Sequence, residues 1–237
     1  AGVCALKPSY GAISRFGLVG LIPSMEACAL LAPDLGSIRT LLAAIAGPDE
    51  ADFSLPAGTE LDLGAGSIDP TATTIIGYIA EMLAGLSAEE AEVFHDTLRA
   101  LRERGLTVRA LSMPAMSLFS LVHQIVGSVE ASSCLGRYDS VRYGPRAPGA
   151  KNWNDMYLHS RGAAFGTLLK SYLMQGAYFQ FQRYQAFEDA CRIRARLVAE
   201  MQRLSGEVDF LVLPMGATTG TTAAGAGPAA AAPDAAA

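Results

Sequence analysis

The sequence carries no surplus of positive charge, and this limits what the chain can bind by itself. Its 237 residues include 18 Lys and Arg against 23 Asp and Glu, which gives a net charge of -5 and a pI near 5.2. Tight, sequence-independent binding of nucleic acid needs a basic field that neutralises phosphates. The composition therefore disfavours the chain alone as such a binder, and a partner would have to supply that charge.

Clustered metal ligands are also missing. The cysteines lie far apart without a C-x-x-C pair, and no histidine has a second ligand three or four residues away on an evident helix. These residues are Cys4, Cys28, Cys134, Cys191, His95, His123 and His159. Zinc sites and disulfide frameworks both depend on closer spacing. We therefore expect four free, mostly buried thiols, ordinary surface or capped histidines, and no metal site.

Long apolar runs are absent as well. The apolar stretch at 27–32 is bounded by Glu26 and by Pro33-Asp34, whereas a membrane span needs roughly 18 to 20 apolar residues. The chain begins with neither Met nor a charged segment, so no targeting signal can be read from it. We expect no membrane-spanning segment.

The sequence does contain clear helix and strand patterns. Residues 34–46 repeat apolar positions at helical spacing, with Asp34 as the expected N-cap and Gly47-Pro48 as the stop. The β-branched segment 73–80, the helical segment 87–105 and the segment 106–114 predict a βαβ unit with two parallel strands. Ser87 and Glu90 have the spacing of a capping box. The predicted fold class is therefore α/β.

The remainder of the chain adds helices, one strand and a tail. Residues 116–136 and 161–204 have helical spacing, and residues 209–214 predict a strand that is buried on both faces. Residues 49–72 are rich in Gly, Pro, Asp and Ser and predict a surface connection. Residues 216–237 have no side chain larger than Thr or Asp, which predicts a disordered tail. We therefore expect one domain over 1–215, followed by the tail at 216–237.

Several segments together resemble the amidase signature enzymes, and among them the A subunits of tRNA-dependent amidotransferases. G-V-C-A-L-K-P-S-Y-G-A-I-S-R-F-G-L at 2–18 is similar to the family's G-V-V-G-L-K-P-T-Y-G-R-V-S-R-Y-G-L. The stretch E-A-S-S-C-L-G-R-Y-D-S-V-R-Y-G at 130–144 resembles the E-A-S-S-N-L-A-R-Y-D-G-V-R-Y-G of those A subunits. S-R-G-A-A-F-G at 160–166 and D-F-L-V-L-P at 209–214 extend the resemblance. It implies a mixed central sheet covered by helices on both faces.

The resemblance also places the family's catalytic residues. It implies that the two catalytic serines and the catalytic lysine lie upstream of Ala1, so that no catalytic residue is expected within this chain. Lys7 and Ser9 are then a strand end and a turn, because Pro8 forces the preceding residue into an extended conformation and no general base is in view. We therefore expect the isolated chain to be inactive.

Two departures from the family pattern concern the substrate pocket. F-G-T-L-L-K-S-Y-L at 165–173 stands where the A subunits have F-G-x-E-V-K-R-R-I, so Tyr172 lies where the resemblance implies an arginine that holds the substrate's carboxylate. His123-Gln124 stands in the place of the family's tyrosine pair, and Gln124 is a further pocket candidate. The other pocket candidates are Arg137, Asp139, Arg142 and Tyr143. For these four the alternative is a structural ion-pair cluster that pins a loop against the helices.

The resemblance implies amide hydrolysis that supplies ammonia for the transamidation of mischarged tRNA, with a catalytic half outside this chain. The alternatives are a degenerate, non-catalytic subunit with a structural or binding role, and an amidase with another substrate range. The expected partners are other amidotransferase subunits, with tRNA held only through them. ATP and Mg²⁺ are expected in a partner protein of the complex, whereas no cofactor is expected in this chain. The expected location is intracellular, either cytoplasmic or, in a eukaryote, the mitochondrial matrix.

Overall fold

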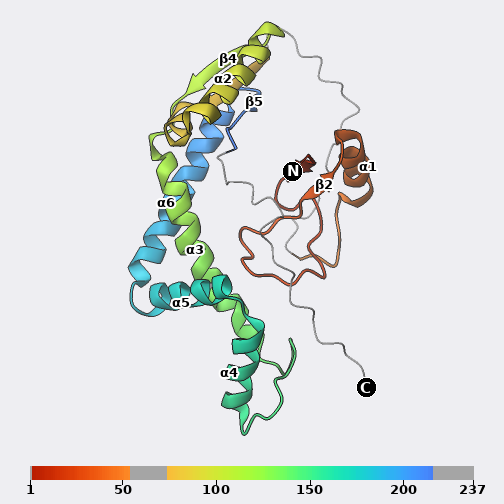
Figure 1. The fold of residues 1–237 in the computed structure, drawn as a ribbon, viewed down its shortest axis with the longest axis vertical. Coiled ribbons are helices and arrows are strands. Elements are labelled where there is room, and N and C mark those ends of the chain that lie inside the picture. Colours follow the sequence, from red (N-terminus) through yellow and green to blue (C-terminus); the bar gives the residue numbers. More distant parts are fainter. Residues whose placement is uncertain (1, 54–73, 216–237) are drawn as a thin grey trace. The chain divides into compact units, whose positions relative to one another are not determined.

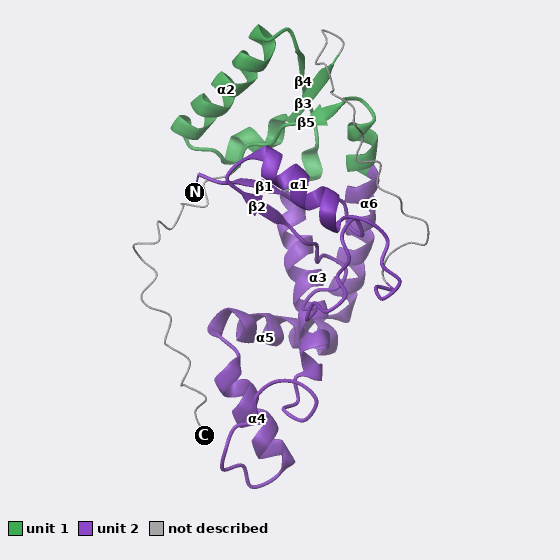
Figure 2. Cartoon of the chain, turned by 90° about the vertical axis from the view of Figure 1, so that its right-hand side faces the viewer, with its two compact units in different colours: residues 1, 68–116, 200–237 green, residues 2–67, 117–199 purple. Residues whose placement is uncertain are grey.

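The computed structural model describes residues 2–53 and 74–215 (Figure 1). The chain divides into two compact units (Figure 2). Unit 1 contains residues 68–116 and 200–237, and unit 2 contains residues 2–67 and 117–199. The predicted tail at 216–237 and most of the predicted connection at 49–72 lie outside the described residues. In chain order the elements are β1 (Cys4–Leu6), β2 (Leu30–Ala32), α1 (Leu35–Ile45), β3 (Ile75–Ile79), η1 (Ala80–Gly85), α2 (Ala88–Glu103), β4 (Thr107–Leu111), η2 (Pro114–Ser117), α3 (Leu118–Cys134), η3 (Leu135–Arg137), α4 (Trp153–Ala164), α5 (Thr167–Phe181), α6 (Tyr184–Ser205) and β5 (Phe210–Leu211).

Unit 1 is built on a parallel sheet in the order β4-β3-β5. β3 pairs with β4 along its whole length and with β5 at two positions, which confirms the predicted parallel strands. Gly77 lies at the centre of β3, and a Cβ atom there would lie 2.9 Å from Leu111 Cδ1 and 3.1 Å from Leu211 Cδ2. Side chains from both neighbouring strands thus close over Gly77, and a larger residue there would need them to shift.

The helix α2 has the start, buried face and stop that its sequence predicts. Ser87 Oγ accepts a hydrogen bond from the Glu90 N–H at 3.3 Å, and the Glu90 carboxylate accepts one from the Ser87 N–H at 2.7 Å, which is a complete capping box. Phe94 and Leu98 are buried. Gly105 follows the helix with φ +86°, a conformation that glycine adopts without strain.

Residues 209–214 were predicted to form a strand that is buried on both faces. The strand is confirmed, and the burial is wrong. β5 is a strand parallel to β3, but it is two residues long, and the Phe210 side chain is 44% exposed. Within the described residues β5 pairs only with β3 and lies at the edge of its sheet. An edge strand leaves part of its apolar run uncovered, so continuous apolar residues did not here indicate burial on both faces.

In unit 2 the segment from β1 to α1 forms a small packed body. β1 and β2 are antiparallel, and α1 packs on them with Asp34 as its N-cap, since Asp34 Oδ1 accepts a hydrogen bond from the Ser37 N–H at 2.8 Å. This confirms the predicted helix. The buried side chains of the body are Ile13, Leu30, Ala32 and Ile38.

The segment between β1 and the buried Gly11 is a turn. The Ala12 N–H donates to the Ser9 carbonyl at 3.1 Å, and the Tyr10 hydroxyl donates to the Pro23 carbonyl at 3.1 Å. Lys7 Nζ donates to the carbonyl of the adjacent Pro8 at 3.3 Å. The interpretation of Lys7 and Ser9 as a strand end and a turn is therefore confirmed.

The helices α3 and α5 pack closely in unit 2. A Cβ atom on Gly176 of α5 would lie 2.1 Å from the carbonyl oxygen of Ser128 in α3, so the two backbones come together at this point. Val122, Val126 and Val129 of α3 are buried. The helical stretch Pro114–Arg137 has the length and composition to cross a membrane, although no uninterrupted apolar run in the sequence is that long, and 39% of its apolar window is buried. A packed core helix passes the same test.

Candidate substrate-side site in unit 2

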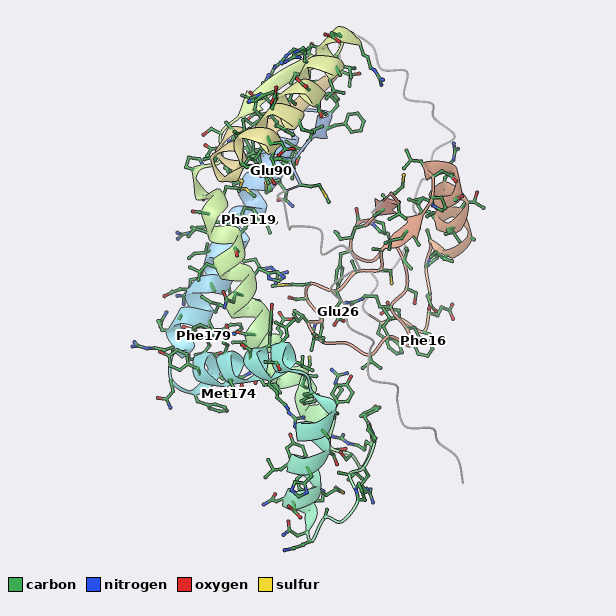
Figure 3. The ribbon with its side chains drawn as sticks, viewed as in Figure 1. Phe16, Glu26, Glu90, Phe119, Met174 and Phe179 are labelled. Carbon is green, nitrogen blue, oxygen red and sulfur yellow. The ribbon has the colours of Figure 1, made fainter. Side chains whose placement is uncertain are left out.

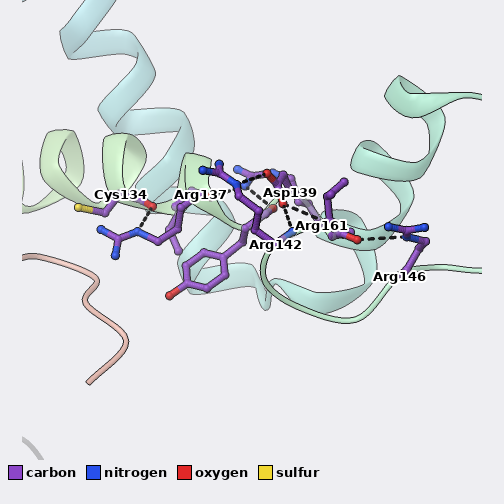
Figure 4. Close-up of polar contacts among 10 residues, drawn as sticks. Cys134, Arg137, Asp139, Arg142, Arg146 and Arg161 are labelled. Carbon is purple, nitrogen blue, oxygen red and sulfur yellow. Dashed lines mark hydrogen bonds and ion pairs between the residues drawn. The ribbon is translucent and has the colours of Figure 1, made fainter. Parts of the chain in front are cut away.

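The loop after η3 is folded around the carboxylate of Asp139. Its Oδ1 accepts hydrogen bonds from the N–H groups of Val141 at 3.0 Å and Arg142 at 2.9 Å, and Oδ2 accepts one from Arg142 Nε at 3.0 Å (Figure 4). Ser140 is buried and has φ +63°, a conformation that is uncommon for any residue except glycine. This geometry supports the structural interpretation of Asp139 and Arg142, in which they hold the loop's shape.

The same hydrogen bonds keep Asp139 ionised. The N–H of Arg142 and then the N–H of Val141 lower the pKa of the Asp139 carboxyl well below its ordinary value of 3.8, with a further contribution from the Arg142 guanidinium. Both N–H groups stabilise the charged form of the carboxylate. At neutral pH the Asp139 carboxylate is therefore ionised, and the loop is folded around it.

A cleft of about 380 Å³ lies beside this loop. Arg161 of α4 lines it and donates hydrogen bonds to the backbone carbonyls of Leu135 and Tyr138, the latter at 3.2 Å. The Arg161 guanidinium also lies over the rings of Tyr157 and Phe165, at 4.6 and 4.7 Å from their centroids. The other lining residues are Val19, Gly20, Leu21, Leu135, Tyr138, Ser140, Gly144, Pro145, Ser160, Ala164, Phe165 and Leu169.

The walls of the cleft are mainly apolar, and the polar side chains of Ser160 and Arg161 are already paired. Ser160 is buried, and its Oγ accepts a hydrogen bond from the Ala147 N–H at 2.9 Å. Arg161 is engaged by two carbonyl oxygens and two rings. The arrangement can enclose a small, largely apolar group, and it holds the loop from Tyr138 to Ala147 against α4.

The structure separates the predicted pocket residues into two groups. Asp139, Arg142 and Tyr143 lie on the loop beside the cleft, while Arg137 is exposed and donates from Nε to the Cys134 carbonyl at 3.0 Å. The Tyr143 ring meets the Tyr138 ring edge-on, with 6.2 Å between centroids. None of these predicted residues lines the cleft, so their role at a substrate pocket stays a prediction.

The second group lies where α3 and α5 pack. Gln124 is exposed, and its Nε2 donates to Gln175 Oε1 at 2.7 Å. Tyr172 is half-buried on α5 near Gly127. The residues that sequence reasoning did not single out are Ser160 and Arg161. The S-R-G-A-A-F-G segment at 160–166 could have indicated both residues. It resembles the family, and an arginine in such a segment is a candidate site residue.

A second polar cluster joins the N-terminal segment to two helices of unit 2. Glu130 of α3 accepts hydrogen bonds from the N–H of Ser24 at 3.0 Å and from its Oγ at 2.5 Å. Arg194 of α6 donates to Ser24 Oγ at 2.9 Å and to its carbonyl oxygen at 3.0 Å. Nearby in the chain, the Glu26 carboxylate accepts from the N–H groups of Leu21 and Ile22 and shapes the loop that carries Ser24 (Figure 3).

The described residues contain no group of three or more His, Cys, Asp or Glu side chains that could hold a metal ion. His123 is exposed, and His159 lies 3.3 Å from an Asp155 oxygen on the surface of α4. Three of the cysteines are half-buried and Cys191 is exposed, so the expectation of mostly buried thiols was too strong. The polar groups of unit 2 thus serve mainly to position its loops.

With this fold and site, the chain belongs to the amidase family, whose model matches residues 1–231. Among its relatives is a protein of Natronomonas pharaonis that is named as the A subunit of a glutamyl-tRNA(Gln) amidotransferase. It is 32% identical over 223 residues, or 90% of this chain and 51% of the relative. A protein of the same name from Thermus thermophilus is 34% identical over 90% of this chain and 45% of the relative. The chain thus spans about half the length of the curated relatives it matches.

Solved structures show the same fold. An amidase crystal structure aligns with a TM-score of 0.63 and 20% identity, over 91% of this chain and 42% of that one. The A subunit of the glutamyl-tRNA(Gln) amidotransferase from Thermotoga maritima aligns with a TM-score of 0.62 and 18% identity, over 87% and 40%. The α/β class, with a parallel sheet and helices, and a partial amidase signature fold are thereby confirmed.

Proposed function

We propose that this chain forms the substrate-side scaffold of an amidotransferase-type amidase, which hydrolyses an amide and supplies ammonia to a mischarged tRNA. The observation that carries the proposal is the E-A-S-S…R-Y-D-S-V-R-Y-G segment. Glu130 at its start pins Ser24, and Asp139 near its end closes the loop beside the cleft. The relatives that share the family and 31–34% of their aligned residues are named as such subunits.

The isolated chain is proposed to be inactive. The activated nucleophile of such a hydrolase needs an adjacent base or a lowered pKa, and the resemblance puts the catalytic serines and lysine upstream of Ala1. Other proteins of the assembly would hold the tRNA and bind ATP and Mg²⁺. This chain would supply no site for the ATP and Mg²⁺ that the transamidation uses, and would work in the cytoplasm or the mitochondrial matrix.

A second candidate is a degenerate subunit without catalysis, and specific contacts favour it. The remaining cation of the 165–173 segment is Lys170, whose Nζ donates to the Gly162 carbonyl at 2.7 Å and is therefore engaged in capping α4. Gln124, which with His123 replaces the family's tyrosine pair, is hydrogen-bonded to Gln175. A third candidate, an amidase for less polar amides, is favoured by the apolar cleft walls Leu135, Phe165 and Leu169.

One experiment separates these candidates. The coding sequence upstream of Ala1 is read for a lysine and a Ser-Ser-Gly-Gly-Ser run, and the product of the longer reading frame is assayed for ammonia release. Glutamine as the preferred substrate supports the amidotransferase-type role, and preference for an apolar amide such as benzamide supports the third candidate. Absence of the lysine and serines contradicts both and leaves the non-catalytic role.

A further inference from the structure

Residues 137–161 concentrate positive charge in an acidic chain. The segment has five Lys and Arg side chains against two Asp, whereas the whole chain has a net charge of -5. Aromatic side chains are interleaved with these cations, as they are in many nucleotide-binding surfaces. The basic residues are Arg137, Arg142, Arg146, Lys151 and Arg161, and the aromatic residues are Tyr138, Tyr143, Trp153 and Tyr157.

The second half of this loop lines a depression of its own. A depression of about 500 Å³ is lined by residues 146–153 together with Val141 and Met156. It shares no lining residue with the 380 Å³ cleft. The depression is therefore a separate site on unit 2, formed by the second half of the loop and the start of α4.

Two of the cations line this depression and keep their charge available. Arg146 donates from Nε to the Ser140 carbonyl at 3.1 Å, which fixes the guanidinium through one nitrogen (Figure 4). Lys151 uses its backbone N–H for Asp155 Oδ2 at 2.9 Å. Among the ion pairs of the described residues, neither Arg146 nor Lys151 takes part. Arg142, by contrast, is paired with Asp139.

The carboxylate on the first turn of α4 is engaged by the backbone of Lys151 and by His159 of its own helix. Asp155 Oδ2 accepts the Lys151 N–H, and its Oδ1 lies 3.3 Å from His159 Nε2. Asp155 does not line the depression. The two cations on the wall therefore face the solvent of the depression without an acidic side chain among its lining residues.

Trp153 supplies an aromatic wall. Its ring is stacked on that of Tyr157, with 5.2 Å between centroids and 12° between planes. The side chain lines the depression and remains 55% exposed. One face of the indole is thus held by Tyr157, and the ring is fixed in orientation with surface left for a second ring.

We propose that this depression binds a nucleoside phosphate, with the base stacked on Trp153 and the phosphate held between Arg146 and Lys151. Guanidinium and ammonium groups are the usual partners of phosphate oxygens, and a base on an aromatic ring adds a sequence-tolerant contact. A single phosphate needs two cations, not the extended basic field that a tightly bound nucleic acid needs. The site is independent of the amidase function proposed above.

The chain offers a direct probe of this site, because Trp153 is its single tryptophan. The intrinsic fluorescence of the full 237-residue chain is titrated with AMP, adenosine, inorganic phosphate and benzoate. We expect saturable quenching by AMP and at least tenfold weaker effects of adenosine and of inorganic phosphate, because each lacks one of the two contacts. Raising the salt concentration weakens AMP binding, since the phosphate contact is ionic.

Matched variants localise the binding. Arg146→Ala with Lys151→Ala removes two charges from the depression, and AMP affinity is expected to fall at least tenfold. Arg99→Ala with Arg192→Ala removes two exposed, surface-paired arginines elsewhere, and AMP affinity is expected to stay within about twofold. Circular dichroism checks the fold of each variant, and Lys151→Ala alone replaces the double variant should that one not fold.

Several results would overturn the proposal. One is the absence of saturable quenching up to about 10 mM AMP, which is about tenfold above a Kd of roughly 1 mM. Another is equal AMP affinity in the wild-type chain and in the Arg146/Lys151 variant. Benzoate binding as tightly as AMP would assign the depression to ring-bearing carboxylates instead of phosphates.

Discussion

Glu130 and Ser24 are joined by two hydrogen bonds across 106 residues of sequence: the carboxylate accepts the Ser24 N–H at 3.0 Å and the Ser24 hydroxyl at 2.5 Å. Arg194 holds the same serine from α6 through its hydroxyl and its carbonyl oxygen. Through these hydrogen bonds Ser24 fixes its loop to both α3 and α6. Because every one of these partners is polar and at least partly enclosed, removal of one leaves others without hydrogen bonds.

The first prediction concerns this cluster. Glu130→Ala is expected to lower the free energy of unfolding by about 1 to 3 kcal/mol, because the Ser24 N–H and hydroxyl lose their acceptor. The measurement is the urea midpoint. The exposed Glu103→Ala serves as a control, with a change of no more than about 0.5 kcal/mol. Ser24→Ala should add little in the Glu130→Ala background, and fully additive losses would show that the two residues are not coupled.

Two helical glycines should respond to the same substitution with opposite signs. Gly176→Ala puts a Cβ where the Ser128 carbonyl lies at 2.1 Å, so α3 and α5 must separate. We expect a loss of about 1 to 3 kcal/mol. Gly162→Ala in α4 meets nothing within 4 Å and is expected to stabilise by about 0.5 to 1 kcal/mol. Thermal melts of both variants test this, and equal shifts would contradict the close packing.

Arg161 should not tolerate a change to lysine. The guanidinium donates to two backbone carbonyls and lies over two rings, and an ammonium cannot reproduce this planar fork. Arg161→Lys is expected to cost about 1 to 3 kcal/mol in urea denaturation. Arg196→Lys, at an exposed position of α6, is the matched control. A loss shared by both variants would contradict a specific role for Arg161.

The loop at Asp139 should keep its fold in mild acid. Its pKa is lower in the folded loop than the ordinary 3.8, so ionisation favours the folded form. The contribution is present above about pH 4 and declines as the pH falls below that value through the folded pKa. The amide NMR signals of Val141 and Arg142 are therefore expected to titrate with a midpoint below 3.8, and Asp139→Asn should abolish the step. A midpoint at or above 3.8 would be inconsistent with the two N–H bonds.

Local signals in the sequence were enough to predict the βαβ part of unit 1. The capping box at Ser87 and Glu90, the apolar face at Phe94 and Leu98, and the β-branched run at 73–80 act within a few residues of one another. Each of them determines a local conformation whatever the rest of the chain does. The burial of β5 was not predictable in this way, because it depends on which neighbours the strand has and not on its own residues.

The candidate site was less accessible from sequence. Family resemblance pointed to the segment 130–144, but the pairing of Glu130 with Ser24 and of Arg161 with the Leu135 and Tyr138 carbonyls joins residues that no spacing rule connects. Gln124 was grouped with Arg137 on that resemblance alone. In the structure Gln124 bonds to Gln175 on α5, because helix packing decides the partners of a surface amide.

The pairing of β3 with β5 has a consequence for synthesis of the chain. The Ile75 N–H donates to Asp209 Oδ2 at 2.7 Å across 134 residues. Residues 117–199 of that interval belong to unit 2. At about 5 to 20 residues per second, a ribosome needs roughly 7 to 27 s to make that interval. During this time β3 and β4 can already pair, while the other edge of β3 waits unpaired outside the tunnel. For those seconds the unpaired edge of β3 can associate with other nascent chains that are being made on the same mRNA. Folding of this chain therefore depends on protection of that edge until β5 has been synthesised.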